Sequence, residues 1–352
     1  MLSGADRVVT EVTELLGPSL DKREELRSGL QALNLVRQFR PTDALTVAGV
    51  DGGFAVERTA AVDLLLAVAV GVEGLSDRTT PWDSTQYKWW SRVSKHDQDA
   101  ERMARGAMVA QELAILHAAP HDLRILDGSH LTLVIQLNSA LTSSSDDIRR
   151  ESLRLWQDLG TVGALQDVCS SDVFIAMPKY DSSRTVTELL EKHFATAIPG
   201  DDKYLMGLLL NAGEVLIPQQ VPHEPWAALH FTAFAPTEQQ TASDLTKAID
   251  TLKRREIAFT YFKPERFSPA FRIELKRSLP LERLDAICST IAGQITGPFV
   301  REPYPQYLAD VMAKSVGLGL SALQTAVQLG LSGLGRPEIA EFLVHSYRTE
   351  GI

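Results

Sequence analysis

LTVAGVDGG, residues 45–53, is the stretch around which this chain of 352 residues is organised. An apolar run rich in β-branched residues leads into a carboxylate and two glycines, and a second apolar run follows at 60–72. These runs predict a buried strand that ends at Asp51, a tight turn and a return strand. Glycine can adopt positive φ, and Gly52 and Gly53 leave the space beside the carboxylate free of side-chain bulk. A strand that ends in an acid can build a metal or phosphate site, or it can make a plain turn.

A second acid, Glu112, lies in the middle of a helix predicted for residues 98–118. Acidic residues at the start of this helix suit its dipole, and Pro120 ends it. The neighbours of Glu112 one turn away are apolar, among them Met108 and Leu116. A carboxylate in such surroundings is costly unless it meets water or a cation. The pattern therefore predicts either a solvent-exposed glutamate or an acid that faces a bound cation.

The third acid, Asp127, follows an apolar run within LRILDGS, residues 123–129. Three acids thus occur in order: Asp51 at the end of the first strand, Glu112 on the following helix and Asp127 at the end of the next strand. A strand, a hairpin, a helix and a strand with acids at those places form the layout of a ribonuclease-H-like site. We therefore expect an α/β fold, a ribonuclease-H-like mixed sheet core flanked by helices, with additional N- and C-terminal helices.

Lys179 follows another apolar run, residues 173–178, which predicts a further strand. A lysine at the end of such a strand could hold a scissile phosphate or orient a water, and it could equally be a solvated side chain. At the N-terminal end, residues 5–38 predict two helices outside the main sheet, with a break at Gly17-Pro18.

The remaining pattern predicts helices and strands that complete a single domain. The other predicted helices are 146–168 (as one or two), 186–194, 242–253, 281–295, 307–329 and 337–347, and the other predicted strands are 227–234, 257–262 and 271–275. The expected division of the domain, residues 1–352, is N-terminal helices over 1–40, the core with insertions over 41–315 and C-terminal helices over 316–352.

Residues 74–99 form a polar segment in which aromatic and basic side chains are interleaved. This composition suits stacking on nucleic-acid bases. It suits equally well a long surface loop whose tryptophans pack back on the core. The aromatic residues are Trp82, Tyr87, Trp89 and Trp90, and the basic ones are Lys88, Arg92, Lys95 and His96.

Composition indicates an ordinary globular protein, with 44% hydrophobic and 23% charged residues. Cys169 and Cys288 are far apart, which argues against a disulfide framework or a structural zinc site and fits a reducing cytoplasm. The N-terminus lacks a signal-peptide pattern, and the apolar run at 62–72 is too short to cross a bilayer. We therefore expect a cytoplasmic protein without a membrane contact. The net charge of −10 argues mildly against nucleic-acid binding, although acids that bind metal also lower it.

With these residues in place, the chain resembles the NurA nuclease family. The matching segments span residues 45–315, and their order is more specific than any one of them. They are Val50-Asp51-Gly52-Gly53, Glu112, Leu126-Asp127-Gly128-Ser129, Met177-Pro178-Lys179-Tyr180-Asp181-Ser182-Ser183, Asp202 with Gly213-Glu214, and Pro303-Tyr304-Pro305.

The resemblance implies a manganese-dependent DNA nuclease with a ribonuclease-H-like core. Members of the family act as homodimers beside the hexameric translocating ATPase HerA, on single- and double-stranded DNA ends. It further implies 5′–3′ exonuclease and single-strand endonuclease activity in break repair or defence. Asp51, Glu112 and Asp127 would be the metal-binding and catalytic acids, and Lys179 and Tyr304 would lie near the metal or the phosphate.

Two positions depart from the family pattern. Members often carry a histidine or an acid shortly after the Tyr-Pro element, and here the candidate metal ligand is Asp310. A glycine is more usual before that element, whereas this chain has Glu302-Pro303.

The expected chemistry follows from charge. Crowded carboxylates repel each other, and a divalent cation relieves that repulsion while it keeps them ionised. Hard oxygen ligands suit Mn²⁺ or Mg²⁺ rather than zinc, and we expect two ions that activate a water and stabilise charge on the phosphate.

Two other classes of function share parts of this pattern. Acetate- and sugar-kinase-like phosphotransferases also begin with an Asp-Gly-Gly turn that faces nucleotide phosphates, although a second phosphate loop at 127–129 would fall too early in the chain. The third possibility is a catalytically inactive partner subunit of a DNA translocase, against which the complete set of acids argues.

Overall fold

The computed structural model describes residues 2–78, 80, 82, 86–180, 182–221, 257–297, 301–343 and 346–350, together with isolated positions between 240 and 250. The expected strand at 227–234 and most of the expected helix at 242–253 lie outside these residues, as does Asp181. Among the described helices, none combines the length and the hydrophobicity that a bilayer-spanning segment needs.

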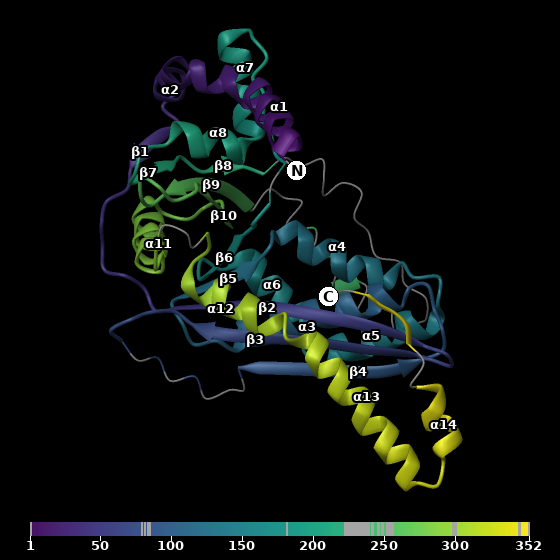
Figure 1. The fold of residues 1–352 in the computed structure, drawn as a ribbon. Helices are drawn as coiled ribbons and strands as arrows, with labels where there is room; N and C mark the ends of the chain where they lie inside the picture. Colours follow the sequence, from purple (N-terminus) through teal and green to yellow (C-terminus); the bar gives the residue numbers. More distant parts are fainter. Residues whose placement is uncertain are drawn as a thin grey trace.

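Within this part of the chain, eleven strands form one mixed sheet that runs the length of the molecule (Figure 1). The strands are β1 Val36–Gln38, β2 Val47–Thr59, β3 Asp63–Glu73, β4 Tyr87–Ser94, β5 Leu123–Asp127, β6 Phe174–Met177, β7 Glu214–Leu216, β8 Gln219–Gln220, β9 Ile257–Lys263, β10 Phe271–Lys276 and β11 Ser346–Glu350.

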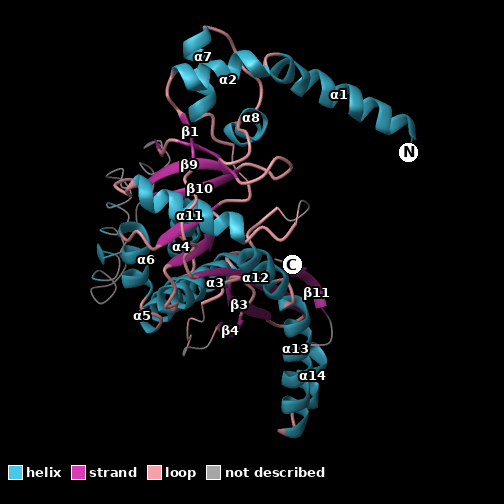
Figure 2. Cartoon of the chain, turned by 90° about the vertical axis from the view of Figure 1, so that its left-hand side faces the viewer, coloured by secondary structure: helices cyan, strands magenta, loops and turns pink. Residues whose placement is uncertain are grey.

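Helices cover both faces of the sheet. They are α1 Leu2–Asp21, α2 Arg23–Ala32, α3 Ala100–Ala118, α4 His130–Leu141, α5 Asp146–Asp158, α6 Thr161–Ser170, α7 Thr185–Phe194, α8 Asp202–Leu209, α11 Leu281–Gly293, α12 Tyr304–Ala313, α13 Val316–Gly333 and α14 Pro337–Phe342. One face packs mainly against α3, α4, α6 and α8 and the other against α11, α12 and α13. Figure 2 shows that α1 and the pair α13–α14 project from the body of the molecule.

Five neighbouring strands confirm the predicted ribonuclease-H-like sheet. Their order is β4-β3-β2-β5-β6, in which β2, β3 and β4 are antiparallel and β5 and β6 run parallel to β2. Both faces of β3 are covered, which explains its almost continuously apolar sequence. Helix α3 connects β4 to β5 and packs on β2 and β3, so that it can carry a side chain to their edge.

The tight turn predicted at Gly52-Gly53 is wrong. β2 continues through both glycines to Thr59, in regular antiparallel register with β3, and neither glycine has a positive φ. The hairpin turns instead at residues 59–62, where the backbone N–H and the hydroxyl of Thr59 both donate to the carbonyl oxygen of Val62. Asp51 therefore lies within a long strand rather than at its end.

The predicted N-terminal helix boundaries are also displaced. Helix α1 continues past Gly17-Pro18, and the break between the two helices is at Lys22. Residues 36–38 belong to strand β1, which pairs with β7, rather than to a helix.

At the C-terminal end, the single helix predicted for 307–329 is two helices. Helix α12 begins earlier, at Tyr304, and a break at Lys314-Ser315 separates it from α13. The predicted helix 337–347 ends at Phe342, and residues 346–350 form β11, which pairs with the far half of β2.

Residues 87–94 of the aromatic segment form strand β4 rather than part of a loop. β4 pairs along β3, and it leaves Trp89 and Tyr87 exposed while Trp90 packs against the cluster around Leu65. Trp82 packs edge-on against the buried ring of His121, with centroids 5.2 Å apart. The tryptophans therefore divide between the core and the surface.

An ion pair connects the N-terminal helices to the sheet. The guanidinium of Arg27 donates to both carboxylate oxygens of Glu214, at 2.6 and 2.8 Å, and both side chains are mostly buried. Burial opposes the charge of Glu214, but hydrogen bonds from Arg27 and from the backbone of Asn211 outweigh it and lower its pKa. Glu214 and its partner therefore have a structural role.

We expect Glu214→Gln to lower the free energy of unfolding by about 2 kcal/mol at neutral pH, the usual contribution of a charged hydrogen bond. The lowered pKa means that this contribution is present above the unfolded value of about 4.3 and is lost as the pH falls through the folded value. Urea unfolding of the wild type and the variant should therefore converge at acid pH. Glu24→Gln, whose side chain is 84% exposed, is the control and should cost less than about 0.5 kcal/mol.

Candidate functional site

The candidate site lies at a gap beside β2. On the edge of β2 away from β3, pairing with β5 ends at Val50, and pairing with β11 begins at Val56. Among the described strands, none pairs with the backbone of residues 51–55 on this edge of β2, which leaves an opening between β5 and β11. Asp51 is the first residue of this opening, and Asp127 ends the strand that borders it.

Strand register determines the direction of the two aspartates. Asp51 pairs opposite Val70, which packs against α12, and Asp127 pairs opposite Met177 on the same face of the sheet. Gly128 at φ +76° turns the chain directly after Asp127, and Ser129 caps α4 by accepting a hydrogen bond from the backbone N–H of Thr132. This local turn fixes Asp127 at the end of its strand.

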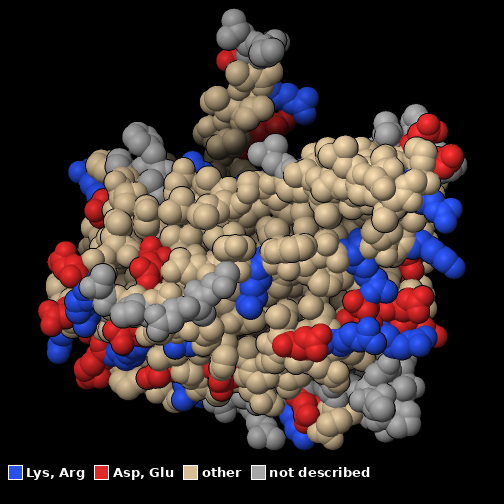
Figure 3. Space-filling view, turned by 90° about the horizontal axis from the view of Figure 1, so that it is seen from below, with Lys and Arg blue, Asp and Glu red and all other residues tan. Residues whose placement is uncertain are grey.

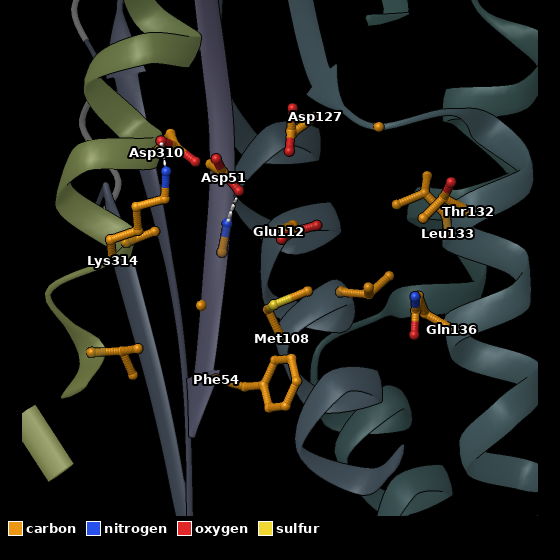
Figure 4. A pocket seen from close by; sticks show the side chains of 16 residues that line it. Asp51, Phe54, Met108, Glu112, Asp127, Thr132, Leu133, Gln136, Asp310 and Lys314 are labelled. Atoms are coloured by element: carbon orange, nitrogen blue, oxygen red, sulfur yellow. Dashed lines mark hydrogen bonds and ion pairs between the residues drawn. The ribbon is translucent and has the colours of Figure 1, made fainter. Parts of the chain in front are cut away.

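Glu112 reaches the site from the opposite face of the sheet. It projects from α3 across Gly52, where an added Cβ would lie 2.3 Å from its Oε1 and 2.5 Å from Cγ of Met108. Figure 4 shows the carboxylates of Asp51, Glu112 and Asp127 directed toward the same space. Gly52 was predicted to leave the space beside Asp51 free of side-chain bulk, whereas in the structure the side chains of Glu112 and Met108 occupy that space.

Lys179 lies at the centre of four carboxylates. Its Nζ donates to Oδ1 of Asp310 at 3.0 Å, and it lies 3.5 Å from Oδ2 of Asp51. It is also 3.6 Å from Oδ1 of Asp127 and 3.3 Å from Oε2 of Glu302. An acid-rich site is thus assembled around one ammonium group.

Burial and mutual repulsion perturb the acids. Burial, followed by the charge of Asp127, raises the pKa of Asp51 to about 7. Burial and the charges of Asp51 and Asp127 also raise the pKa of Glu112. Burial opposes the charge of Lys179, but the neighbouring aspartates outweigh it and raise its pKa. The raised pKa values mean that these acids resist ionisation together, and a bound cation would favour their ionised forms.

The donor set fits a divalent cation. All the candidate ligands are carboxylates, and the buried Oδ1 of Asp127 and Oε2 of Glu302 accept no hydrogen bond. The described residues nevertheless contain no group of three or more His, Cys, Asp or Glu side chains close enough to form a ready metal cage. Lys179 lies between the acids instead, so a metal ion would have to displace its ammonium group or share the acids with it.

The structure brings together five of the six residues that the sequence singled out, and it places Tyr304 elsewhere. Tyr304 begins α12 and packs against Val70 and Val72 of β3. Asp202, in the matching segments, accepts hydrogen bonds from the backbone of Val186 and Thr187 and thereby holds the start of α7.

Two charged groups of the site were missed from the sequence. Glu302 was noted only as a departure from the family pattern, although it contributes a carboxylate. Lys314 binds Oδ2 of Asp310 at 2.5 Å from one helical turn later. The i, i+4 spacing of Asp310 and Lys314 was the signal that could have identified this pair.

Comparison with known proteins supports the fold. A scan against protein-family models finds no match, and a search of curated proteins finds none either. Among solved structures, the chain is similar to the NurA nuclease from Sulfolobus solfataricus, with 14% identity and a TM-score of 0.54 over 91% of this chain and 98% of that one. It is also similar to a NurA bound to dAMP and manganese, with 12% identity and a TM-score of 0.51 over 87% and 92% of the two chains. The chain therefore has a NurA-like fold.

Proposed function

We propose that this protein is a metal-dependent deoxyribonuclease that hydrolyses phosphodiester bonds. The observation that carries the proposal is the convergence of Asp51, Glu112 and Asp127 from a strand, a helix and a second strand on the open edge of β2. The phosphotransferase alternative required a phosphate-facing turn at Gly52-Gly53, and these residues are instead extended within β2.

Asp51, Glu112 and Asp127 would hold Mn²⁺ or Mg²⁺, as one or two ions, and Asp310 would complete the set. Bound divalent ions supply an activated water and stabilise charge on the phosphate and the leaving oxygen. Lys179 is positioned to bind a non-bridging phosphate oxygen, because it is cationic and lies among the same acids. Lys314 orients Asp310 from the outer side.

We further propose DNA ends as the substrate, with 5′–3′ exonuclease and single-strand endonuclease activity. The deoxynucleotide and manganese bound to one NurA structure support this substrate class. Figure 3 shows Lys and Arg mixed with Asp and Glu around broad uncharged areas on the face seen from below. DNA is therefore expected to bind at a local site rather than across that face.

Assembly is the remaining part of the proposal. We propose a homodimer and a HerA-type hexameric ATPase as partners, in the cytoplasm and in repair or defence. What supports a protein partner is the projecting helix α1, which exposes apolar side chains that a monomer would normally cover (Figure 2). These exposed side chains are Val8, Val9, Val12, Leu15 and Leu20.

The test is cleavage of end-labelled single- and double-stranded DNA, with Mn²⁺ or EDTA and with or without the ATPase. We expect Mn²⁺-dependent cleavage that EDTA abolishes. Mn²⁺ should also raise the melting temperature, since a ligand at 100 times its Kd stabilises the folded state by about 2.7 kcal/mol. If Mn²⁺ raises the melting temperature but the protein cuts neither DNA, with or without the ATPase, the proposed nuclease activity is contradicted. If Mn²⁺ neither raises the melting temperature nor supports cleavage, the protein is an inactive partner subunit.

A further inference from the structure

We infer that the pocket beside the acids is a binding site for one nucleobase of the DNA strand, adjacent to the scissile phosphate. This inference rests on the proposed function. The pocket has a volume of about 540 Å³, within the range that encloses small ligands. Asp51, Glu112 and Asp127 lie at one end of it (Figure 4). A DNA strand whose scissile phosphate lies at these acids would therefore place the nearest nucleobase at the mouth of the pocket.

The walls of the pocket are mainly apolar and come from β2 and from four helices, α3, α4, α12 and α13. Phe54 of β2 and Met108 of α3 form one side, and α4 faces them across the pocket (Figure 4). The guanidinium of Arg105 lies 5.1 Å from the centroid of the Phe54 ring and helps to hold it in place. The polarisable thioether of Met108 adapts to flat surfaces. The other apolar lining residues are Val109, Leu133, Ala313 and Val316.

The polar groups distinguish this pocket from a purely apolar groove. The charged lining residues are the acids and Lys314, and on the α4 side the polar groups are the neutral side chains of Thr132 and Gln136. Among the described residues, the amide of Gln136 makes no hydrogen bond. It offers one acceptor and two donors, which can pair with the edge of any base. A ligand with a phosphate at one end and a neutral planar heterocycle at the other is a nucleotide.

This geometry has a consequence for the substrate. A base inside a duplex is stacked on both sides and cannot enter a side pocket without leaving the stack. We therefore expect the pocket to favour single-stranded DNA and frayed duplex ends as substrates. Because the Gln136 amide can pair with any base, we expect little preference among the four bases.

The test uses a single-stranded oligonucleotide that carries one tetrahydrofuran abasic residue. We expect the wild type with Mn²⁺ to cut the linkage at that residue about tenfold more slowly than the same linkage with a base, as for the loss of one stacked base. Gln136→Trp should fill the pocket, slow the base-bearing linkage about tenfold and leave the abasic linkage unchanged. Gln166→Trp, on the exposed side of α6, is the matched control and should change neither rate.

A binding measurement gives a second readout. With Mn²⁺ present, dCMP should raise the melting temperature more than deoxyribose 5-phosphate does, and Gln136→Trp should remove the difference. Equal cleavage of abasic and base-bearing linkages by the wild type would overturn the base site while the nuclease assignment stands. Equal slowing of both linkages by Gln136→Trp would also overturn it. Failure to cut any linkage would instead count against the proposed function.

Discussion

Asp51→Asn should reduce Mn²⁺-dependent DNA cleavage by about 10³-fold or more, while the protein remains folded. Asparagine has the shape of aspartate and can keep the acceptor for the backbone N–H of Gly52, which lies 2.7 Å from Oδ1. The substitution removes a negative charge that is buried beside Asp127, so it should not destabilise the metal-free protein. The loss of activity would then report on the charge itself.

Two measurements separate this effect from misfolding. The melting temperature without metal should match or exceed that of the wild type, and the rise caused by Mn²⁺ should disappear. Asp147→Asn, on the exposed surface of α5, provides the same chemical change away from the site and should leave cleavage and metal response unchanged. Cleavage by Asp51→Asn within tenfold of the wild type would remove Asp51 from the site.

The order of the three acids could be predicted because each signal is local. Asp127 follows an apolar strand and precedes a glycine turn, and the helix that carries Glu112 has a clear start and end. The role of Gly52 could be predicted only in part. A glycine that makes a turn and a glycine that allows close approach look identical in sequence, since the difference lies in Glu112, sixty positions away.

The rest of the site depends on contacts between distant segments. Glu302 joins it only because Lys179 lies nearby after β6. Tyr304 was expected near the metal, but its position at the start of α12 directs it against β3. Strand β11 has the polar sequence SYRTE, which carries no apolar alternation, and it is a strand because the edge of β2 is available for pairing.

Gly52→Ala should reduce cleavage by about 10²-fold with little loss of stability. The new Cβ would lie 2.3 Å from Oε1 of Glu112 and 2.5 Å from Cγ of Met108, so the carboxylate must move away from the other acids. Both contacts are with flexible side chains, and Gly52 has no positive φ, so the backbone can accept alanine. Gly163→Ala in α6 meets nothing within 4 Å and is the control, expected to stabilise the helix by up to about 1 kcal/mol.

A double-mutant cycle tests whether Gly52 acts through Glu112. Glu112→Gln alone should lose at least as much activity as Gly52→Ala, because it removes the carboxylate that the alanine only displaces. If both act on that one group, the double variant should be no slower than Glu112→Gln, since effects on a shared group are not additive. Losses that multiply in the double variant would show that Gly52 serves the site independently. Losses that do not multiply would show that glycine is needed at position 52 because the carboxylate of Glu112, on α3, occupies the space where a larger residue would place its Cβ.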